Sequence, residues 1–129
     1  MFKTLIIDDD PIQLRLAEML FKRSDLFGQT MSFTGAADAL NFLGNQENAH
    51  LLPDVILLDL NMPLIDGWTF LSRYAQIRPL MRKKIDLFIL SSSIDEKDIL
   101  RSRSFQFVTG YISKPMSPAI LDEIITQLS

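Results

Sequence analysis

Acidic side chains follow two short apolar runs of the chain, and their type and spacing are typical of phosphate chemistry. The first run ends in three consecutive acids, Asp8, Asp9 and Asp10, and the second run, Val55 to Leu58, ends in Asp59. Carboxylates without accompanying His or Cys ligands select a hard cation, and Mg2+ fits best because it needs few protein oxygens and keeps its waters for a phosphate. Asp59 could itself be a nucleophile, because carboxylates form aspartyl-phosphates.

Hydroxyl groups and an amine follow two later apolar runs. Ser91 to Ser93 follow the run Asp86 to Leu90, and Lys114 follows the run Phe107 to Ile112. A lysine and a hydroxyl near a cation can hold a phosphoryl group, since its transfer depends mostly on positioning and charge neutralisation. Taken singly, each polar group has a structural explanation as a helix cap, a capped turn or a solvated strand end. Their coincidence at equivalent strand ends favours the chemical interpretation.

The chain alternates strand patterns with helix patterns. The five apolar runs that predict strands are Phe2 to Ile7, Gln29 to Phe33, Val55 to Leu58, Asp86 to Leu90 and Phe107 to Ile112. This alternation predicts an α/β fold with a doubly wound, parallel five-stranded sheet and right-handed crossovers. Ligands of such sheets bind beyond the carboxyl ends of the strands, so we expect the polar groups to meet there.

Five helices are expected between and after these strands. Asp10 is the predicted cap of the first helix, which begins at Pro11. Its buried stripe is expected to consist of Ile12, Leu16 and Leu20, with Ala17 and Phe21. We expect Gly28 to end this first strand and helix unit, before the second strand begins. The last helix is expected to follow a Ser117 cap.

The three middle helices are less regular. Thr34 is the predicted cap of the second helix, and a polar loop is expected over Asn45 to Leu52. Trp68 to Tyr74 is predicted to form a brief third helix, and Gln76 to Lys84 a basic, solvated loop. The fourth helix opens on a capping box over Ser93 to Glu96 or on Asp95 alone. Its few apolar residues indicate either weak docking on the rest of the fold or a surface kept for another role.

Length and composition bound the range of functions. With 129 residues, 47% of them hydrophobic, we expect a single domain over residues 1–129 and no effector domain. A net charge of −3 disfavours direct binding of nucleic acid. The absence of cysteine excludes thiolate catalysis, and the lone His50 is expected to be solvated. No signal peptide or membrane-length apolar run is present, which predicts a cytoplasmic protein without membrane contact.

This pattern resembles the receiver domain of two-component response regulators over the whole length of the chain. The matching residues are Asp8-Asp9, the sequence DLNMPLIDG that begins at Asp59, Ser91, and Lys114-Pro115. The resemblance implies a flavodoxin-like (βα)5 fold with strand order 2-1-3-4-5. It also implies a signalling module and not an enzyme in the ordinary sense, although such domains catalyse their own phosphorylation and dephosphorylation.

The resemblance assigns roles to the acids. It implies that Asp59 is the phosphoacceptor and that Asp9, Asp59 and the backbone carbonyl of Asn61 bind Mg2+. Asp8 would act on the metal through water. The implied phosphodonor is a histidine kinase or a phosphotransfer protein.

The resemblance also implies a switch. Ser91 would bond the phosphoryl oxygen, Lys114 would pair with it, and Tyr111 would be the aromatic residue whose rotamer follows activation. Ser91 stands where threonine is commoner, so a looser switch is expected. The output would reach a downstream protein target that the sequence does not name, or a second copy of the chain in a phosphorylation-dependent homodimer.

Two other interpretations compete with this one. A phosphohydrolase of the haloacid-dehalogenase type would use Asp8 and Asp10, which have the spacing of that family's first motif, with Lys114 as its lysine. That fit is poorer, because Ile12 stands where threonine or valine is expected and Asp59 is left unexplained. A receiver that has lost its chemistry and only binds proteins is disfavoured, because the acceptor, the metal acids and the lysine are all present.

Overall fold

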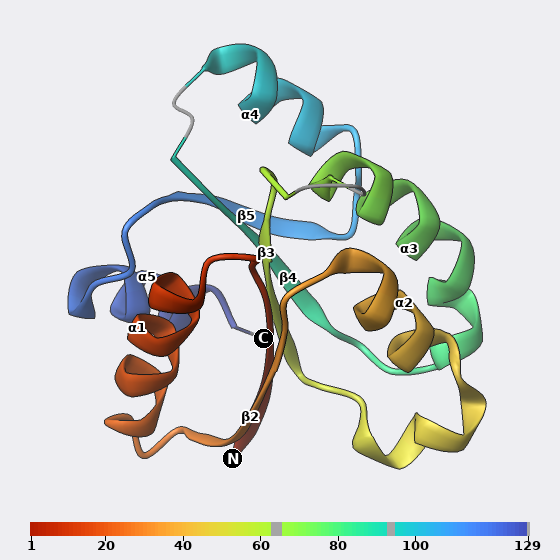
Figure 1. Cartoon of the computed structure of the whole chain (residues 1–129), viewed down its shortest axis with the longest axis horizontal. Helices are drawn as coiled ribbons and strands as arrows, with labels where there is room; N and C mark the ends of the chain where they lie inside the picture. Colours follow the sequence, from red (N-terminus) through yellow and green to blue (C-terminus); the bar gives the residue numbers. More distant parts are fainter. Residues whose placement is uncertain (63–65, 93–94, 129) are drawn as a thin grey trace.

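A single parallel sheet forms the centre of the computed structural model, which describes residues 1–62, 66–92 and 95–128. Its five strands follow the order β2-β1-β3-β4-β5, and every neighbouring pair is parallel (Figure 1). The α/β class and the strand order 2-1-3-4-5 that the sequence analysis predicts are thus confirmed.

The elements alternate along the chain as expected. In order they are β1 (Phe2–Ile7), α1 (Pro11–Lys22), β2 (Phe27–Phe33), α2 (Ala36–Gly44), the 3-10 helix η1 (Gln46–Leu51), β3 (Val55–Asp59), α3 (Gly67–Met81), β4 (Asp86–Ser91), α4 (Glu96–Arg103), β5 (Val108–Ser113) and α5 (Pro118–Gln127). Among the described helices, none combines the length and the apolar character that crossing a membrane requires.

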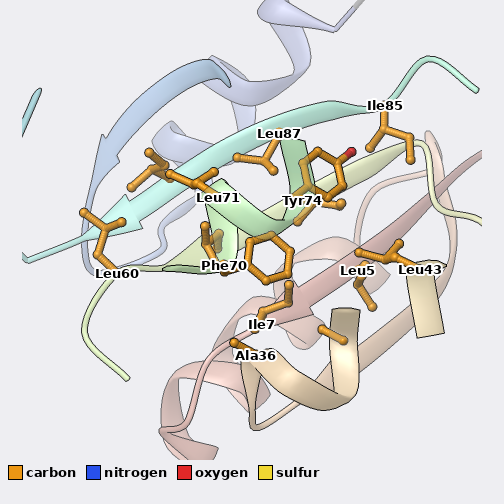
Figure 2. Close-up of a cluster of buried hydrophobic side chains, with 14 of the residues drawn as sticks. Leu5, Ile7, Ala36, Leu43, Leu60, Phe70, Leu71, Tyr74, Ile85 and Leu87 are labelled. Carbon is orange, nitrogen blue, oxygen red and sulfur yellow. The ribbon is translucent and has the colours of Figure 1, made fainter. Parts of the chain in front are cut away.

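Helices cover both faces of the sheet, and each face has its own apolar core. Helices α1 and α5 pack on one face, where Phe21 and Ile124 are fully buried. Helices α2 and α3 pack on the other face (Figure 1), where Phe70, Leu71 and Tyr74 from α3 meet the central strands (Figure 2). Strand β3 is buried along its whole length, as expected for the central strand of a doubly wound sheet.

The first helix confirms its predicted cap and corrects its predicted stripe. The Asp10 side chain accepts a hydrogen bond from the Ile12 backbone N–H at 2.9 Å, and Pro11 is the first helical residue. Ile12 itself is 76% exposed, and Leu14 is buried in its place. Ala17, Leu20 and Phe21 are buried as predicted, so the error is confined to the start of the stripe, where Ile12 lies on the side of the helix opposite to Leu14.

Two predicted boundaries in the second unit are wrong. Strand β2 begins at Phe27, because Phe27 packs into the α1 and α5 core, so Gly28 lies inside the strand. Helix α2 has Gly35 and not Thr34 at its N-cap, without a side-chain cap. The predicted polar loop after α2 contains η1, which begins with an Asn45 side-chain cap, and His50 is exposed there as expected.

Helix α3 is longer than predicted. It continues through Pro79 to Met81, whereas the sequence pattern predicted an end at Tyr74 and a loop from Gln76. A proline inside a helix removes one backbone hydrogen bond, but Ile77 and Met81 pack against the core on either side of Pro79 and offset that loss. The basic run after the helix is also less free than predicted, because Lys83 forms an ion pair of 3.2 Å with Asp54.

The last two helices agree with the sequence analysis. Asp95 caps α4 by accepting a hydrogen bond from the Lys97 backbone N–H at 2.9 Å, and the alternative cap, Ser93, lies outside the described residues. Ser102 is the one buried residue of α4, so the weak docking predicted for this helix is confirmed. Ser117 caps α5 as predicted.

A close backbone approach fixes where α3 begins. The Gly67 N–H donates to the Leu60 carbonyl at 2.9 Å, so the chain returns to the end of β3 before the helix starts. A Cβ at position 67 would lie 2.6 Å from the Leu60 Cα and 2.9 Å from the Asp59 carbonyl oxygen. Glycine is therefore required here by lack of space.

Replacing this glycine gives the first prediction. Gly67→Ala should lower the free energy of unfolding by about 2 kcal/mol or more, because backbone atoms must move to admit the methyl group. Gly44→Ala is the matched control, since a Cβ there meets only Ile77 side-chain atoms at 3.8 Å. Urea unfolding of both variants tests the prediction, and equal stabilities would contradict it.

Candidate functional site

Two buried carboxylates lie side by side at the carboxyl edge of the sheet. Ile7 pairs with Leu58 in the parallel register of β1 and β3, so the next residue of each strand, Asp8 and Asp59, emerges at the same level. Asp8 is 2% exposed and Asp59 is 4% exposed. Two like charges held this close in a buried place need compensation.

Asp9 completes a cluster of three acids. One carboxylate oxygen from each of Asp8, Asp9 and Asp59 lies within 4.8 Å of the other two, and Asp9 is exposed. The cluster is thus buried on the sheet side and open to solvent on the other. Asp10 is not part of it, because its carboxylate caps α1.

Lys114 provides the positive charge for this cluster. Its Nζ lies 3.0 Å from Asp8 Oδ2 and 3.3 Å from Asp59 Oδ1, so one ammonium bridges the two buried acids. Its backbone N–H donates to the Ser91 carbonyl at 2.9 Å, which places Lys114 directly beyond the end of β4. The Lys114-Pro115 peptide bond is cis.

Two backbone N–H groups hold the buried carboxylates from the loop side. The Asp10 N–H donates to Asp8 Oδ1 at 2.9 Å, and the Asn61 N–H donates to Asp59 Oδ1 at 3.2 Å. Each carboxylate is therefore oriented by the turn that follows its own strand. Sequence reasoning did not identify these amides, because every residue type offers one and only the turn geometry aims it.

The surroundings of Asp59 disfavour its charged form, whereas those of Lys114 favour the ammonium. Burial and then the neighbouring Asp8 charge raise the pKa of Asp59 from 3.8 to about 6, and Lys114 and the Asn61 amide offset only part of this rise. Burial alone would lower the pKa of Lys114, but its hydrogen bond to Asp8 and the Asp59 charge outweigh burial and raise it. Lys114 is thus charged, and its single ammonium lies between the two buried carboxylates of a cluster of three.

This donor set fits a divalent cation of the Mg2+ type. The three acids offer hard oxygen ligands, and their excess of two negative charges over Lys114 matches a dication. Exposure of Asp9 leaves room for the waters that Mg2+ retains.

The side chains of Ser91 and Tyr111 lie on the same face of the sheet, and Ser91 ends the strand next to Asp59. Tyr111 pairs with Ile89 in the register of β4 and β5, and Ser91 is two residues beyond Ile89. Side chains two residues apart in a strand point to the same face, so both point to the face that α3 covers. Ser91 is fully buried and Tyr111 is half-buried.

The structure thus brings together Asp8, Asp9, Asp59 and Lys114, with Ser91 at the end of the neighbouring strand. Asn61 contributes an N–H bond, and the predicted metal bond from its carbonyl stays a prediction. Tyr111 lies farther along β5 and takes no part in the acid cluster.

Comparisons with known proteins agree with this site. Residues 4–126 match the family described as the response regulator receiver domain. Response regulator Rcp1 of Synechocystis is 31% identical over 113 residues, which are 85% of this chain and 74% of Rcp1. A two-component response regulator from Cytophaga hutchinsonii superposes with a TM-score of 0.87 at 29% identity, covering 98% of this chain and 95% of that one.

A solved structure of Rcp1 described as its Mn2+-bound form also resembles the chain. It has a TM-score of 0.77 at 26% identity and covers 97% of this chain and 89% of its own. The chain belongs to the response regulator receiver domain family, whose members are phosphoacceptor modules of two-component signalling. The haloacid-dehalogenase alternative has no support, since Asp10 is engaged as the cap of α1.

The raised pKa of Asp59 predicts how stability depends on pH. Between pH 3.8 and about 6 the folded protein binds more protons than the unfolded chain, so its free energy of unfolding falls as the pH rises through this window. Asp59→Asn removes the free-energy cost of holding a charged carboxylate at this buried position. In EDTA the variant should be more stable than the parent by about 2 kcal/mol at pH 8, and the difference should vanish near pH 3.

Urea unfolding across this pH range is the measurement. Asp10→Asn serves as the control, because asparagine caps a helix as well as aspartate does and the site is exposed. If the difference in free energy of unfolding between Asp59→Asn and the parent stays constant from pH 3 to pH 8, the ionisation of Asp59 is not its cause.

Proposed function

We propose that this chain is a Mg2+-dependent phosphoacceptor and that Asp59 carries the phosphoryl group. The observation behind the proposal is the position of Asp59: a carboxylate at the end of the central strand, next to two further acids and within 3.3 Å of the Lys114 ammonium. Asp59 is buried at a strand end, accepts a hydrogen bond from a backbone N–H of the following loop, and contacts Lys114. Within the described cluster, Asp8 alone shares these three features. The family resemblance distinguishes the two acids, because the sequence DLNMPLIDG that begins at Asp59 matches the acceptor segment of receiver domains.

Asp9 and Asp59 would hold the Mg2+ directly, with the Asn61 carbonyl, and Asp8 through water. When bound, the cation neutralises charge on the phosphoryl group and on the acids. Support comes from the hard oxygen donors and from their excess negative charge. The Mn2+-bound form described for Rcp1 is consistent with a divalent cation at such a site.

In the proposed reaction an Asp59 oxygen attacks the phosphorus of a phosphohistidine. The new O–P bond forms as the P–N bond breaks, and the imidazole leaves with the electron pair of that bond. Lys114 needs no long movement to pair with a phosphoryl oxygen on Asp59, since it already contacts that carboxylate. The donor is a histidine kinase or a phosphotransfer protein, the partners with which receiver domains interact.

A small phosphodonor tests the proposal. Incubation with acetyl phosphate and Mg2+ should add one phosphoryl group to the protein by intact mass, and EDTA should prevent the addition. Asp59→Asn should abolish the adduct, because the amide is a near isostere without the nucleophilic oxygen charge. Asp9→Ala should raise the Mg2+ concentration that half-maximal phosphorylation requires by roughly tenfold or more.

Melting curves of each variant serve as the folding control. A phosphoryl group on Asp8 in the parent protein, located by peptide mapping after borohydride reduction, would contradict the assignment of Asp59. Full phosphorylation in EDTA would contradict the role of the cation.

We further propose that the signal is read on the face formed by α4, β5 and α5. Helix α4 buries only Ser102 among its residues, so moving it disturbs little apolar packing. Ser91 ends the strand before α4, and Tyr111 lies on the same face of the sheet. New charge-assisted bonds from Ser91 and Lys114 to the phosphoryl group can supply the few kcal/mol that such a switch needs.

Amide chemical shifts with and without beryllium fluoride, a phosphoryl mimic, test this second proposal. We expect changes in Glu96–Arg103 and at Tyr111, in addition to the loops around Asp59. Changes confined to those loops would indicate instead a phosphate shuttle or sink.

A further inference from the structure

Trp68 links the acceptor loop to the fourth helix. It is the only tryptophan of the chain and directly follows Gly67 at the start of α3. The Arg101 guanidinium of α4 lies 4.3 Å from the centre of the Trp68 ring, within the range of a cation–π contact. The Phe105 ring, just after α4, stacks on Trp68 at 6.4 Å with an interplanar angle of 21°.

These contacts matter because α4 buries only one of its residues. Leu100 is 61% exposed, and the one buried residue, Ser102, donates its hydroxyl within the helix to the Ile99 carbonyl. Beyond α4, Phe105 contacts Phe107, whose ring meets Tyr74 in the core at 5.1 Å. The aromatic rings therefore anchor the end of α4, while Arg101 fixes the exposed helix itself to Trp68.

The backbone that precedes Trp68 is connected to the segment that carries Asp59. Gly67 bonds the Leu60 carbonyl at 2.9 Å, and position 67 has no space for a Cβ against Leu60 and the Asp59 carbonyl. Leu60 is the next residue after Asp59. If the backbone at Asp59 and Leu60 moves, Gly67 and Trp68 must move with it, because these close-packed groups leave no free space between them.

We propose that Trp68 is a positioning residue that holds α4, through Arg101, in the place it has while Asp59 carries no phosphoryl group. This proposal rests on the proposed function, because it names what opposes the switch. Phosphorylation of Asp59 has to break or shift the Trp68–Arg101 contact before α4 moves. The contact thus sets how far the unphosphorylated chain favours the resting position of α4.

The expected size of the effect follows from the type of contact. Cation–π contacts at exposed sites contribute about 0.5–1 kcal/mol, which corresponds to a roughly two- to five-fold change in an equilibrium constant. A phosphoryl mimic binds to the active arrangement, so its apparent affinity rises in proportion to the population of that arrangement. Loss of the contact should therefore lower the half-saturating beryllium fluoride concentration roughly two- to five-fold.

Three variants of α4 test the proposal. Arg101→Gln removes the cation from Trp68, Arg101→Lys keeps a cation there, and Arg103→Gln makes the same charge change at an exposed residue two positions later. Each is titrated with beryllium fluoride at fixed Mg2+ by amide chemical shifts, and hydrogen exchange of the α4 amides is followed without the mimic. Melting temperatures show that each variant is folded.

Arg101→Gln should lower the half-saturating concentration roughly two- to five-fold and speed up exchange in α4. Arg101→Lys should restore most of the parent behaviour, and Arg103→Gln should match the parent. A purely structural contact would change exchange and melting temperature but leave the titration unchanged, and that result would overturn the proposal. Failure of the parent to bind beryllium fluoride at all would instead count against the proposed function.

Discussion

The crowding of two carboxylates at the end of the sheet is the constraint on which the site depends. Parallel register delivers Asp8 and Asp59 to the same level, and both are almost completely buried. Burial and then the Asp8 charge raise the pKa of Asp59, and one ammonium and two turn amides offset these effects only in part. The excess of negative charge lowers the stability of the fold and at the same time favours binding of a divalent cation. The arrangement that weakens the fold is therefore also the one that suits a cation.

The rest of the fold keeps these groups at fixed positions. An apolar core packs against each face of the sheet, and this packing fixes the positions of the strand ends relative to one another. The loop after β3 returns to Leu60 through Gly67, and the chain after β5 is tied to Ser91 through the Lys114 N–H. Each polar group of the site thus sits on a rigid strand end or on the first turn beyond it, as precise placement requires.

Much of this arrangement could be predicted from the sequence, and what could not has physical causes. Apolar runs that end in acids, serines and lysine were enough to predict the parallel sheet and the cluster of Asp8, Asp9, Asp59 and Lys114, whereas the strand order came from the family resemblance. The length of α3 was missed because Pro79 is a strong local signal that tertiary packing of Ile77 and Met81 overrides. The contact of Trp68 with Arg101 joins residues 33 positions apart, and no periodicity within either helix records it.

Two connections lead from Asp59 to the side of the molecule that α4 occupies. One passes through Lys114, whose ammonium contacts Asp59 and whose backbone is bonded to Ser91 at the end of β4. The other passes through Leu60 and Gly67 to Trp68 and from there to Arg101. Under the proposed function, a phosphoryl group on Asp59 would compete for Lys114 in the first connection and would press on the Leu60 backbone in the second. The first connection ends on the strand that precedes α4 and the second on α4 itself, so under the proposed function a charge at Asp59 can bias a helix that buries only one residue.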